Sequence, residues 1–279
     1  MLRRIIYIIL LFLLLVMASM SFSYFFPGKV HVLDKLRLAV QAPLMTNIGN
    51  YKYGKVYMHE GEETEGPDDI TYWELRPVLA FLNPGNIIVT RTRRYLSSEF
   101  IPGKWKHSAI YLGDQKRVQQ YFGKDSRICD RLSRYYQTGK EKLIIDSNSE
   151  GVRIHEIQDL SNLNQVSLLN AFMGFELALP RNKTETFVLK AMDQVGKQYD
   201  FDLRMEDKSA IYCSELLVVA LDAVDIHISN SSEAIGRTFI SPDNLVTYIQ
   251  NVGIPDNEFR FMALIEKKDN HLNIVTGNQ

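Results

Sequence analysis

The chain has 279 residues, of which 46% are hydrophobic and 23% charged, a composition that supports a packed core and excludes a low-complexity or disordered chain. Its 32 Lys and Arg against 33 Asp and Glu give a net charge of −1, so no overall positive field attracts a nucleic-acid backbone and no nucleic-acid partner is expected. The two cysteines, Cys129 and Cys213, exclude a disulfide-stapled scaffold and a four-thiolate zinc site.

The first residues predict a membrane helix. Arg3 and Arg4 precede an uncharged, Ile- and Leu-rich stretch over residues 5–26, which as a helix is about 33 Å long and can cross a bilayer. The same order of charged and apolar residues describes a secretory signal peptide. We therefore expect residues 1–26 to be a transmembrane anchor or a signal peptide. The positive-inside preference then places the rest of the chain outside the cytoplasm, anchored or secreted, and in the periplasm if the source is bacterial.

Residues 27–82 are expected to form a lead-in segment. It contains a short amphipathic stretch at 33–40 and an acidic surface loop at 60–69. Apolar residues recur near a helical period from Tyr72 to Leu82, which predicts a helix that ends before Asn83-Pro84-Gly85.

The middle of the chain predicts strands. Residues 86–90, 107–112, 142–146 and 152–157 are rich in β-branched and other apolar residues. The last two are separated by a Ser-Asn-Ser-Glu-Gly turn that suits a hairpin with positive φ at Gly151. We expect these segments to form a small antiparallel sheet.

Helical periodicity follows. It covers residues 187–195, where Gly196 is placed for a C-terminal cap, and residues 216–221, which are apolar almost all round as in a buried helix. Ser241-Pro242-Asp243 predicts the start of a last helix, and residues 259–265 predict an edge strand. Strands followed by helices indicate an α+β domain over residues 83–267, with a C-terminal tail at 268–279.

Cys213 is the candidate nucleophile. If a helix begins near Tyr212, the sulfur lies beside unpaired backbone N–H groups and the positive end of the helix dipole, and both favour the thiolate over the thiol. The alternative is a small buried hydrophobic residue, which is the usual role of an intracellular cysteine.

His107 is the candidate base. It opens a predicted strand, so its imidazole stands at a strand end, where active-site clefts form, and a cysteine nucleophile needs such a base. A single histidine is more often a packed or solvated side chain, and His107 is one of 6 histidines in the chain.

Four ordered blocks strengthen this pairing. They are residues 84–91 (PGNIIVTR), 105–113 (WKHSAIYLG), 196–201 (GKQYDF) and 212–216 (YCSEL). Together they resemble the YiiX/YebB-like group of permuted NlpC-type, papain-like cysteine hydrolases, over roughly residues 83–245. The resemblance implies a circularly permuted papain-like α+β fold in which the histidine precedes the cysteine and the sheet packs against a buried nucleophile helix. Such sites are recognised by geometry and not by chain order.

The resemblance also implies a third polar residue, usually an acid, on the strand after the histidine strand. Asp146 matches that position best, and its carboxylate would hold the imidazole tautomer and stabilise its charged form. The competitor is His155, because related permuted enzymes that act on acyl lipids carry a second histidine in this role. A further alternative makes Asp146 a turn residue that caps residues 147–150.

Other polar residues near the blocks are weaker candidates. The Cys213 backbone N–H is expected in the oxyanion hole, with Tyr212 and Tyr111 as the nearest candidates for a second donor. Tyr199 matches the family's Tyr-Asp pair ahead of the nucleophile and is a candidate for substrate contact or for ordering the loop there. Glu215 is expected to be structural, because a charge on a buried helix needs a partner.

Together with the resemblance, these residues predict a thiol-dependent hydrolase that cleaves an amide bond through an acyl-enzyme, a peptidase or amidase. The expected extracytoplasmic location points toward cell-wall peptides, although the motifs do not specify the substrate. No metal or organic cofactor is implied. A membrane-surface acyltransferase or lipid thioesterase with the same Cys–His pair is the second hypothesis, and an anchored, catalytically silent binding module is the third. The second rests on the anchor and on a basic strip beside His107, formed by Arg91, Arg93, Arg94, Lys104 and Lys106.

Overall fold

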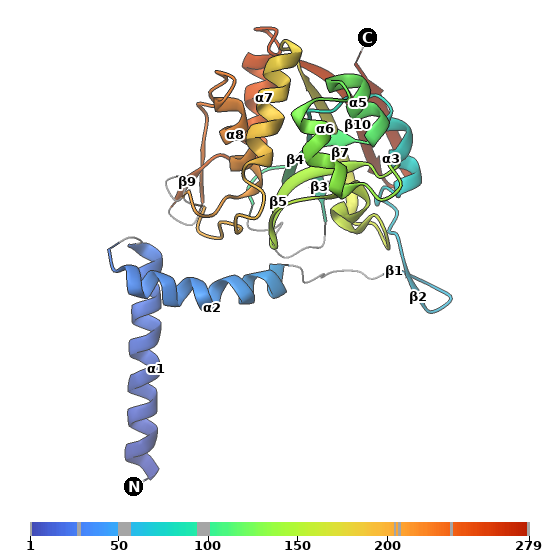
Figure 1. Cartoon of the computed structure of the whole chain (residues 1–279). Coiled ribbons are helices and arrows are strands. Elements are labelled where there is room, and N and C mark those ends of the chain that lie inside the picture. Colours follow the sequence, from blue (N-terminus) through green and yellow to red (C-terminus); the bar gives the residue numbers. More distant parts are fainter. Residues whose placement is uncertain are drawn as a thin grey trace. The chain divides into compact units, whose positions relative to one another are not determined.

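The structure is a computed structural model that describes residues 2–26, 29–49, 57–93, 101–203, 205, 208–234 and 237–277. It divides into two units, residues 1–48 and residues 49–279. The first holds two helices, and the second is the α+β domain (Figure 1).

The N-terminal unit consists of α1 (Leu2–Phe25) and α2 (His31–Gly49). The mean hydropathy of α1 reaches 2.8, and none of its most apolar window is buried within the described part of the chain. Its length and composition suffice to cross a membrane, as a signal sequence would also do. Anchor and signal peptide both remain consistent with α1, and α2 is longer than the expected stretch at 33–40.

The second unit is built on a seven-stranded antiparallel sheet with the order β11-β10-β7-β3-β4-β5-β6. The strands are β3 (Asn86–Thr92), β4 (His107–Gly113), β5 (Leu143–Asn148), β6 (Gly151–Glu156), β7 (Leu169–Leu177), β10 (Phe259–Lys268) and β11 (His271–Thr276). The α+β class is confirmed. So is the β5–β6 hairpin, in which Gly151 has a φ of 92° and pairs with Asn148.

The sheet is larger than expected, for two reasons. β7 was not predicted, because this central strand is apolar on both faces and shows no alternation. The prediction of an edge strand at 259–265 is wrong, since β10 lies between β7 and β11. The edge is β11, inside the segment expected as a tail. Asp269 and Asn270, both with positive φ, form the two-residue turn before it, a hairpin signal that the sequence carried.

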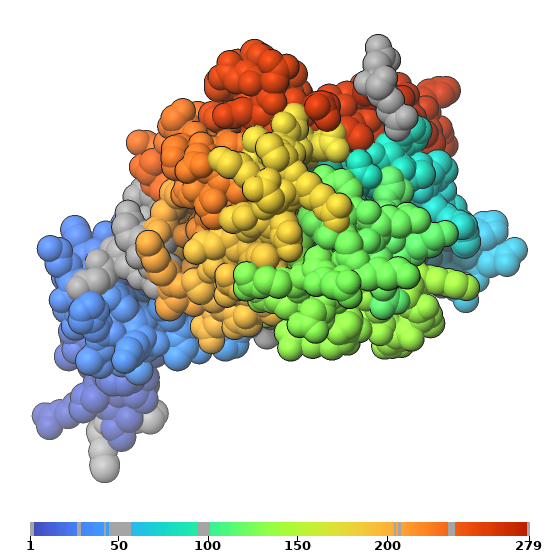
Figure 2. Space-filling view, turned by 45° about the horizontal axis from the view of Figure 1, so that its top comes forward, coloured from blue at the N-terminus to red at the C-terminus, as the bar shows by residue number. Residues whose placement is uncertain are grey.

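Helices cover both faces of the sheet, which explains why its strands read as nearly continuous apolar runs. On one face, Ile110 and Ile145 join the core of five helices: α5 (Gln115–Phe122), α6 (Arg127–Leu132), α7 (Arg181–Met192), α8 (Cys213–Asp222) and α9 (Pro242–Tyr248). On the other face, Ala109 and Ile144 pack with α3 (Tyr72–Leu79). In Figure 2, α7 (yellow) lies beside α6 (green), which it also contacts.

Smaller elements complete the unit. The expected surface loop at 60–69 overlaps a short hairpin of β1 (Tyr57–His59) and β2 (Glu62–Thr64). A second hairpin joins β8 (Ser232–Ala234) and β9 (Arg237–Phe239). The predicted cap of the last helix is confirmed, since Ser241 Oγ accepts a hydrogen bond from Asn244 N–H at the start of α9.

The point where β4 and β5 stop pairing sets the position of His107. The β4–β5 ladder ends at the Ala109–Asp146 pair, although β5 continues to Asn148 through its pairing with β6. His107 and Ser108 therefore lie beyond the last β4–β5 pair, where the two strands have separated. Helix α8 packs against both of these strands.

Candidate active site

Cys213 is the first residue of α8, as predicted. Two buried serines hold the chain around it: Ser147 Oγ donates to the Ile211 carbonyl at 2.6 Å, and Ser214 Oγ donates to the Ile240 carbonyl at 2.6 Å. These bonds attach the start of the helix to β5 on one side and to the segment before α9 on the other. The sulfur is therefore presented at a fixed point by short side chains with little freedom.

Glu215 has the partner that its burial requires. Its Oε2 accepts a hydrogen bond from the Tyr212 N–H at 3.3 Å, which satisfies one of the unpaired N–H groups before the helix. This contact agrees with the structural role expected for Glu215. In the described part of the chain both cysteines are free, and the Cys129 sulfur lies 3.0 Å from the Gly123 carbonyl, so no disulfide removes the Cys213 thiol.

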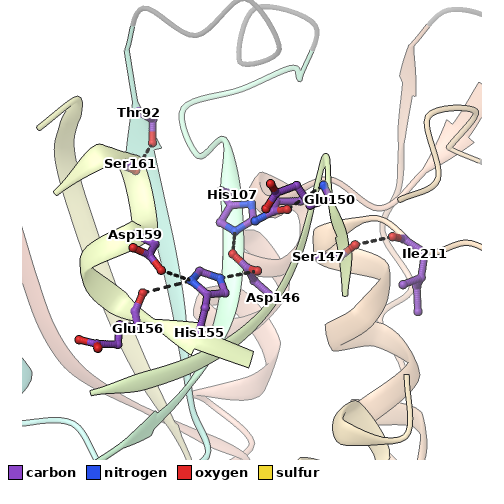
Figure 3. A network of polar contacts seen from close by, with 11 residues as sticks. Thr92, His107, Asp146, Ser147, Glu150, His155, Glu156, Asp159, Ser161 and Ile211 are labelled. Atoms are coloured by element: carbon purple, nitrogen blue, oxygen red, sulfur yellow. Dashed lines mark hydrogen bonds and ion pairs between the residues drawn. The ribbon is translucent and has the colours of Figure 1, made fainter. Parts of the chain in front are cut away.

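His107 and Asp146 lie side by side on neighbouring strands (Figure 3). Residues 107 and 109 share a face of β4, and Ala109 pairs with Asp146, so the pleat places all three side chains on one face. His107 Nε2 lies 2.8 Å from Asp146 Oδ2, and the Asp146 side chain is 1% exposed. Asp146 is within β5 and not in the turn that follows it, so the turn alternative is wrong.

His155 bonds to the same carboxylate. Its Nε2 lies 2.9 Å from Asp146 Oδ1, while its Nδ1 lies 3.1 Å from the Glu156 carbonyl and 3.7 Å from Asp159 Oδ2. His155 reaches Asp146 because it pairs with Ile144, which shares the face of Asp146 on β5. The two residues considered as alternatives for the third position are thus joined in one network, and Asp146 is the one that bonds to His107.

Electrostatics keep this network charged. Burial by itself would raise the pKa of Asp146, but the hydrogen bonds from His107 and His155 outweigh it and hold that pKa well below its usual range. Burial would lower the pKa of His107, yet its bonds to Asp146 and Cys213 raise it to about 10. The His107 ring therefore carries a proton at neutral pH.

The Cys213 thiol responds in the opposite direction. Burial would raise its pKa, but hydrogen bonding and charge from His107, together with the backbone N–H and hydroxyl of Ser108, lower it. Because Nε2 of His107 is engaged with Asp146, Nδ1 is the ring nitrogen left for the sulfur. The arrangement favours a thiolate–imidazolium pair.

Ser108 was not singled out from the sequence. It is 0% exposed, and its Oγ has no hydrogen-bond partner at ordinary distance among the residues that the structure describes. Alternation puts its side chain on the face opposite His107, which is the face covered by α8. Its hydroxyl and backbone N–H interact with the Cys213 sulfur at the point where β4 no longer pairs with β5. The available signal was its position directly after the candidate base.

Residues 81–275 match the sequence profile of the permuted papain-like amidase enzymes, the YaeF/YiiX, C92 family. The chain belongs to this family. Membership confirms the resemblance found in the sequence blocks and implies amide hydrolysis by a cysteine enzyme. No curated protein matches the chain. Among solved structures, metalloprotein yiiX from Escherichia coli O157:H7 matches 70% of this chain and 97% of its own with 12% identity and a TM-score of 0.38.

The tyrosine candidates of this C92 family member separate into two groups. The Tyr212 hydroxyl accepts from the Ile240 N–H at 3.2 Å, and Tyr111 lies farther along β4 with Arg117 and Asp114 as its charged neighbours. Tyr199 and Tyr212 both lie within electrostatic range of Cys213, and burial is the main cause that raises the pKa of each. Substrate contact by Tyr199 stays a prediction.

The basic strip is largely engaged with acids. Arg91 and Lys104 both pair with Glu266, at 3.6 and 2.7 Å, and Arg93 pairs with Asp68. Lys106 donates to the Ile101 carbonyl at 2.6 Å. Arg94 lies outside the described residues. The strip therefore offers less free positive charge to a phospholipid than its sequence suggests.

Among the described residues, no group of three or more His, Cys, Asp and Glu side chains is arranged to hold a metal ion. The Asp146 carboxylate instead bonds to His107 and His155, and His155 Nδ1 lies 3.1 Å from the Glu156 carbonyl.

Proposed function

We propose that this amidase-family protein cleaves amide bonds with Cys213 as nucleophile, His107 as general acid and base, and Asp146 as the residue that orients His107. The proposal rests above all on one observation: His107 is held by Asp146 at 2.8 Å through Nε2 while its ring interacts with the sulfur at the start of α8. Nucleophile, base and orienting group are then in the order that covalent catalysis requires.

The first step forms a thioester. The Cys213 thiolate attacks the carbonyl carbon, the C–S bond forms, and the carbonyl oxygen takes the negative charge. We assign stabilisation of that oxyanion to the Cys213 backbone N–H, at the first helical position, an effect of about 3 kcal/mol per donor. The protonated His107 then gives its proton to the departing nitrogen as the C–N bond breaks, and an amine leaves.

The second step regenerates the enzyme. Neutral His107 takes a proton from a water molecule whose oxygen attacks the thioester carbonyl. The C–S bond breaks, an acid is released, and the proton on His107 again faces a Cys213 thiolate. Asp146 remains ionised throughout, because two donors compensate its buried charge.

Ser108 supports the resting state in this scheme. Its hydroxyl and backbone N–H donate to the thiolate, so the negative charge on sulfur is shared between an imidazolium and two dipoles. Such donors are worth more in a buried site than in water. Deleting the Ser108 hydroxyl should therefore raise the pKa of the Cys213 thiol, although His107 would still stabilise the thiolate.

The substrate is a separate part of the proposal. We propose a peptide or other amide outside the cytoplasm, with cell-wall peptides as the first class to test. The lipid acyltransferase or thioesterase alternative draws on the second histidine and the N-terminal helix. The acid pairing of Arg91, Arg93 and Lys104 weakens its electrostatic support.

One experiment separates the three hypotheses. The purified full chain is incubated with peptidoglycan stem peptides or with phosphatidylethanolamine vesicles, and peptide mass mapping locates any acyl group on sulfur. Acylation of Cys213 from the stem peptide, absent in Cys213→Ala and retained in Cys129→Ala, supports the proposal. Acyl transfer from the lipid alone would overturn the peptidase assignment. A Cys213 that resists both substrates and a thiol reagent would indicate a silent binding module.

A further inference from the structure

The outward face of α2 is apolar. Val32, Leu36, Val40 and Leu44 recur every four residues and are 67%, 57%, 57% and 53% exposed. Residues four apart lie on one side of a helix, so these four form a single stripe. In a helix surrounded by water, such a stripe turns toward the protein core.

Two charged residues of α2 lie inside instead. Asp34 and Arg37 are 7% and 4% exposed; Asp34 is on the side of the helix opposite the stripe, and Arg37 is at its edge, seven residues before Leu44. Ser23 Oγ, near the end of α1, donates to Asp34 Oδ1 at 2.6 Å and accepts from Arg37 Nε at 3.0 Å. The Arg37 guanidinium also lies 5.8 Å from the centre of the Tyr24 ring. The amphipathic pattern of α2 is thus inverted relative to a water-soluble helix.

An inverted pattern is stable where the surroundings are apolar, because charged groups are then satisfied inside the protein and aliphatic groups face outward. α1 and α2 meet at a corner (Figure 1), and the apolar residues next to it are also exposed: Phe22, Phe25, Phe26 and Val30 are 43%, 66%, 55% and 42% exposed. Lys29 and Lys35 are exposed next to this surface, at a place where lipid phosphates could receive them.

We propose that α2 lies in the membrane interface, with the stripe of Val32, Leu36, Val40 and Leu44 among lipid acyl chains, and that α1 and α2 form one retained membrane-bound unit. The occupant of the apolar stripe is thus the bilayer leaflet from which α1 emerges. Retention follows from the Ser23 contacts: cleavage near the end of α1 would remove Ser23 and Tyr24 and expose the buried Asp34 and Arg37 side chains. This inference does not depend on the cysteine chemistry proposed above.

Spin labels on the full chain test the placement. In a Cys129→Ala, Cys213→Ala background, nitroxides are attached at Leu36→Cys, Val40→Cys and Lys190→Cys, and the protein is reconstituted into phosphatidylethanolamine and phosphatidylglycerol vesicles. Lys190, an exposed position on α7, is the matched helical control. Relaxation by oxygen, which concentrates in lipid, is compared with relaxation by a water-soluble nickel chelate.

The proposal expects the oxygen-to-nickel ratio to be severalfold higher at Leu36 and Val40 than at Lys190. Equal ratios at the three positions would place α2 in water and overturn it. Exclusion of both reagents from Leu36 and Val40 would also overturn it, because the stripe would then be covered by protein. Retention is tested separately on protein from cell membranes carrying a C-terminal tag: an intact mass that includes residues 1–26 supports it, and a mass lacking them contradicts it.

Discussion

Asp146 Oδ2 lies 2.8 Å from His107 Nε2, across two antiparallel strands that stop pairing at this point. The contact needs both features. The pleat puts the two side chains on one face, and the end of the ladder leaves the other side of the imidazole open to the start of α8. A contact deeper in the sheet would have placed a strand between the imidazole and Cys213.

We expect the Cys213 thiol to react as a thiolate at a lower pH than an ordinary cysteine. Its pKa is lowered, while that of His107 is raised to about 10, so the ion pair persists between the two values. An ordinary thiol has a pKa of about 8.5. The rate at which iodoacetamide alkylates the Cys129→Ala chain should therefore stay high at pH values well below that. Amide hydrolysis should decline above about pH 10 as His107 loses the proton for the leaving amine. A single alkylation step at the ordinary thiol pKa would contradict the ion pair.

Asp146→Asn should reduce kcat by roughly 10³-fold or more, because the imidazole loses the carboxylate that sets its tautomer and charge. It should also destabilise the fold by about 3 kcal/mol, since two histidines lose a buried counter-charge. The control is Asp159→Asn, which removes a half-exposed carboxylate 3.7 Å from His155 and should change both quantities little.

The stability loss in Asp146→Asn should depend on pH. The pKa of Asp146 is lowered in the folded state, so its contribution is present above the ordinary value of about 4 and lost as pH falls further. The pKa of His107 is raised, so its contribution is complete below about 6.5 and lost as pH rises toward about 10. Urea unfolding should show the largest difference from the wild-type chain between these limits. A difference that does not vary with pH would count against the network.

His155 is a positioning residue in this arrangement, because it acts on His107 only through Asp146. His155→Ala should lower kcat by about tenfold with KM nearly unchanged, since the carboxylate loses one of two tethers. His155→Gln keeps an N–H donor for Asp146 and should restore part of the loss. Steady-state kinetics on folded protein decide the matter, and equal kcat in all three chains would show that the second tether is dispensable.

Ser108→Ala should separate stability from reactivity. Apart from its interaction with the Cys213 sulfur, the hydroxyl is buried without a hydrogen-bond partner among the described residues, so its removal should change stability by no more than about 1 kcal/mol. The alkylation pKa of Cys213 should rise and kcat should fall, because the thiolate loses a donor. Thr184→Val, which alters another buried hydroxyl on α7, is the control and should leave the thiol unaffected. A lower unfolding midpoint with unchanged thiol reactivity would mean that Ser108 is only structural.

Local signals carried much of the fold. The hairpin around Gly151, the start of α8 at Cys213 and the cap at Ser241 depend on a few adjacent residues, so each was predicted from sequence. β7 was missed because a strand buried on both faces has no alternation.

The sequence by itself determined which residue types were available: one cysteine at a helix start, one histidine at a strand start, and an apolar segment long enough to span a bilayer. It could rank Asp146 and His155 but treated them as rivals. Only the tertiary structure decided that both bond to each other, because strand register sets which side chains share a face. The same is true of Ser108 and of the inverted α2. Whether a hydroxyl lacks a partner, or an aliphatic stripe faces outward, depends on what folding brings against it from distant parts of the chain.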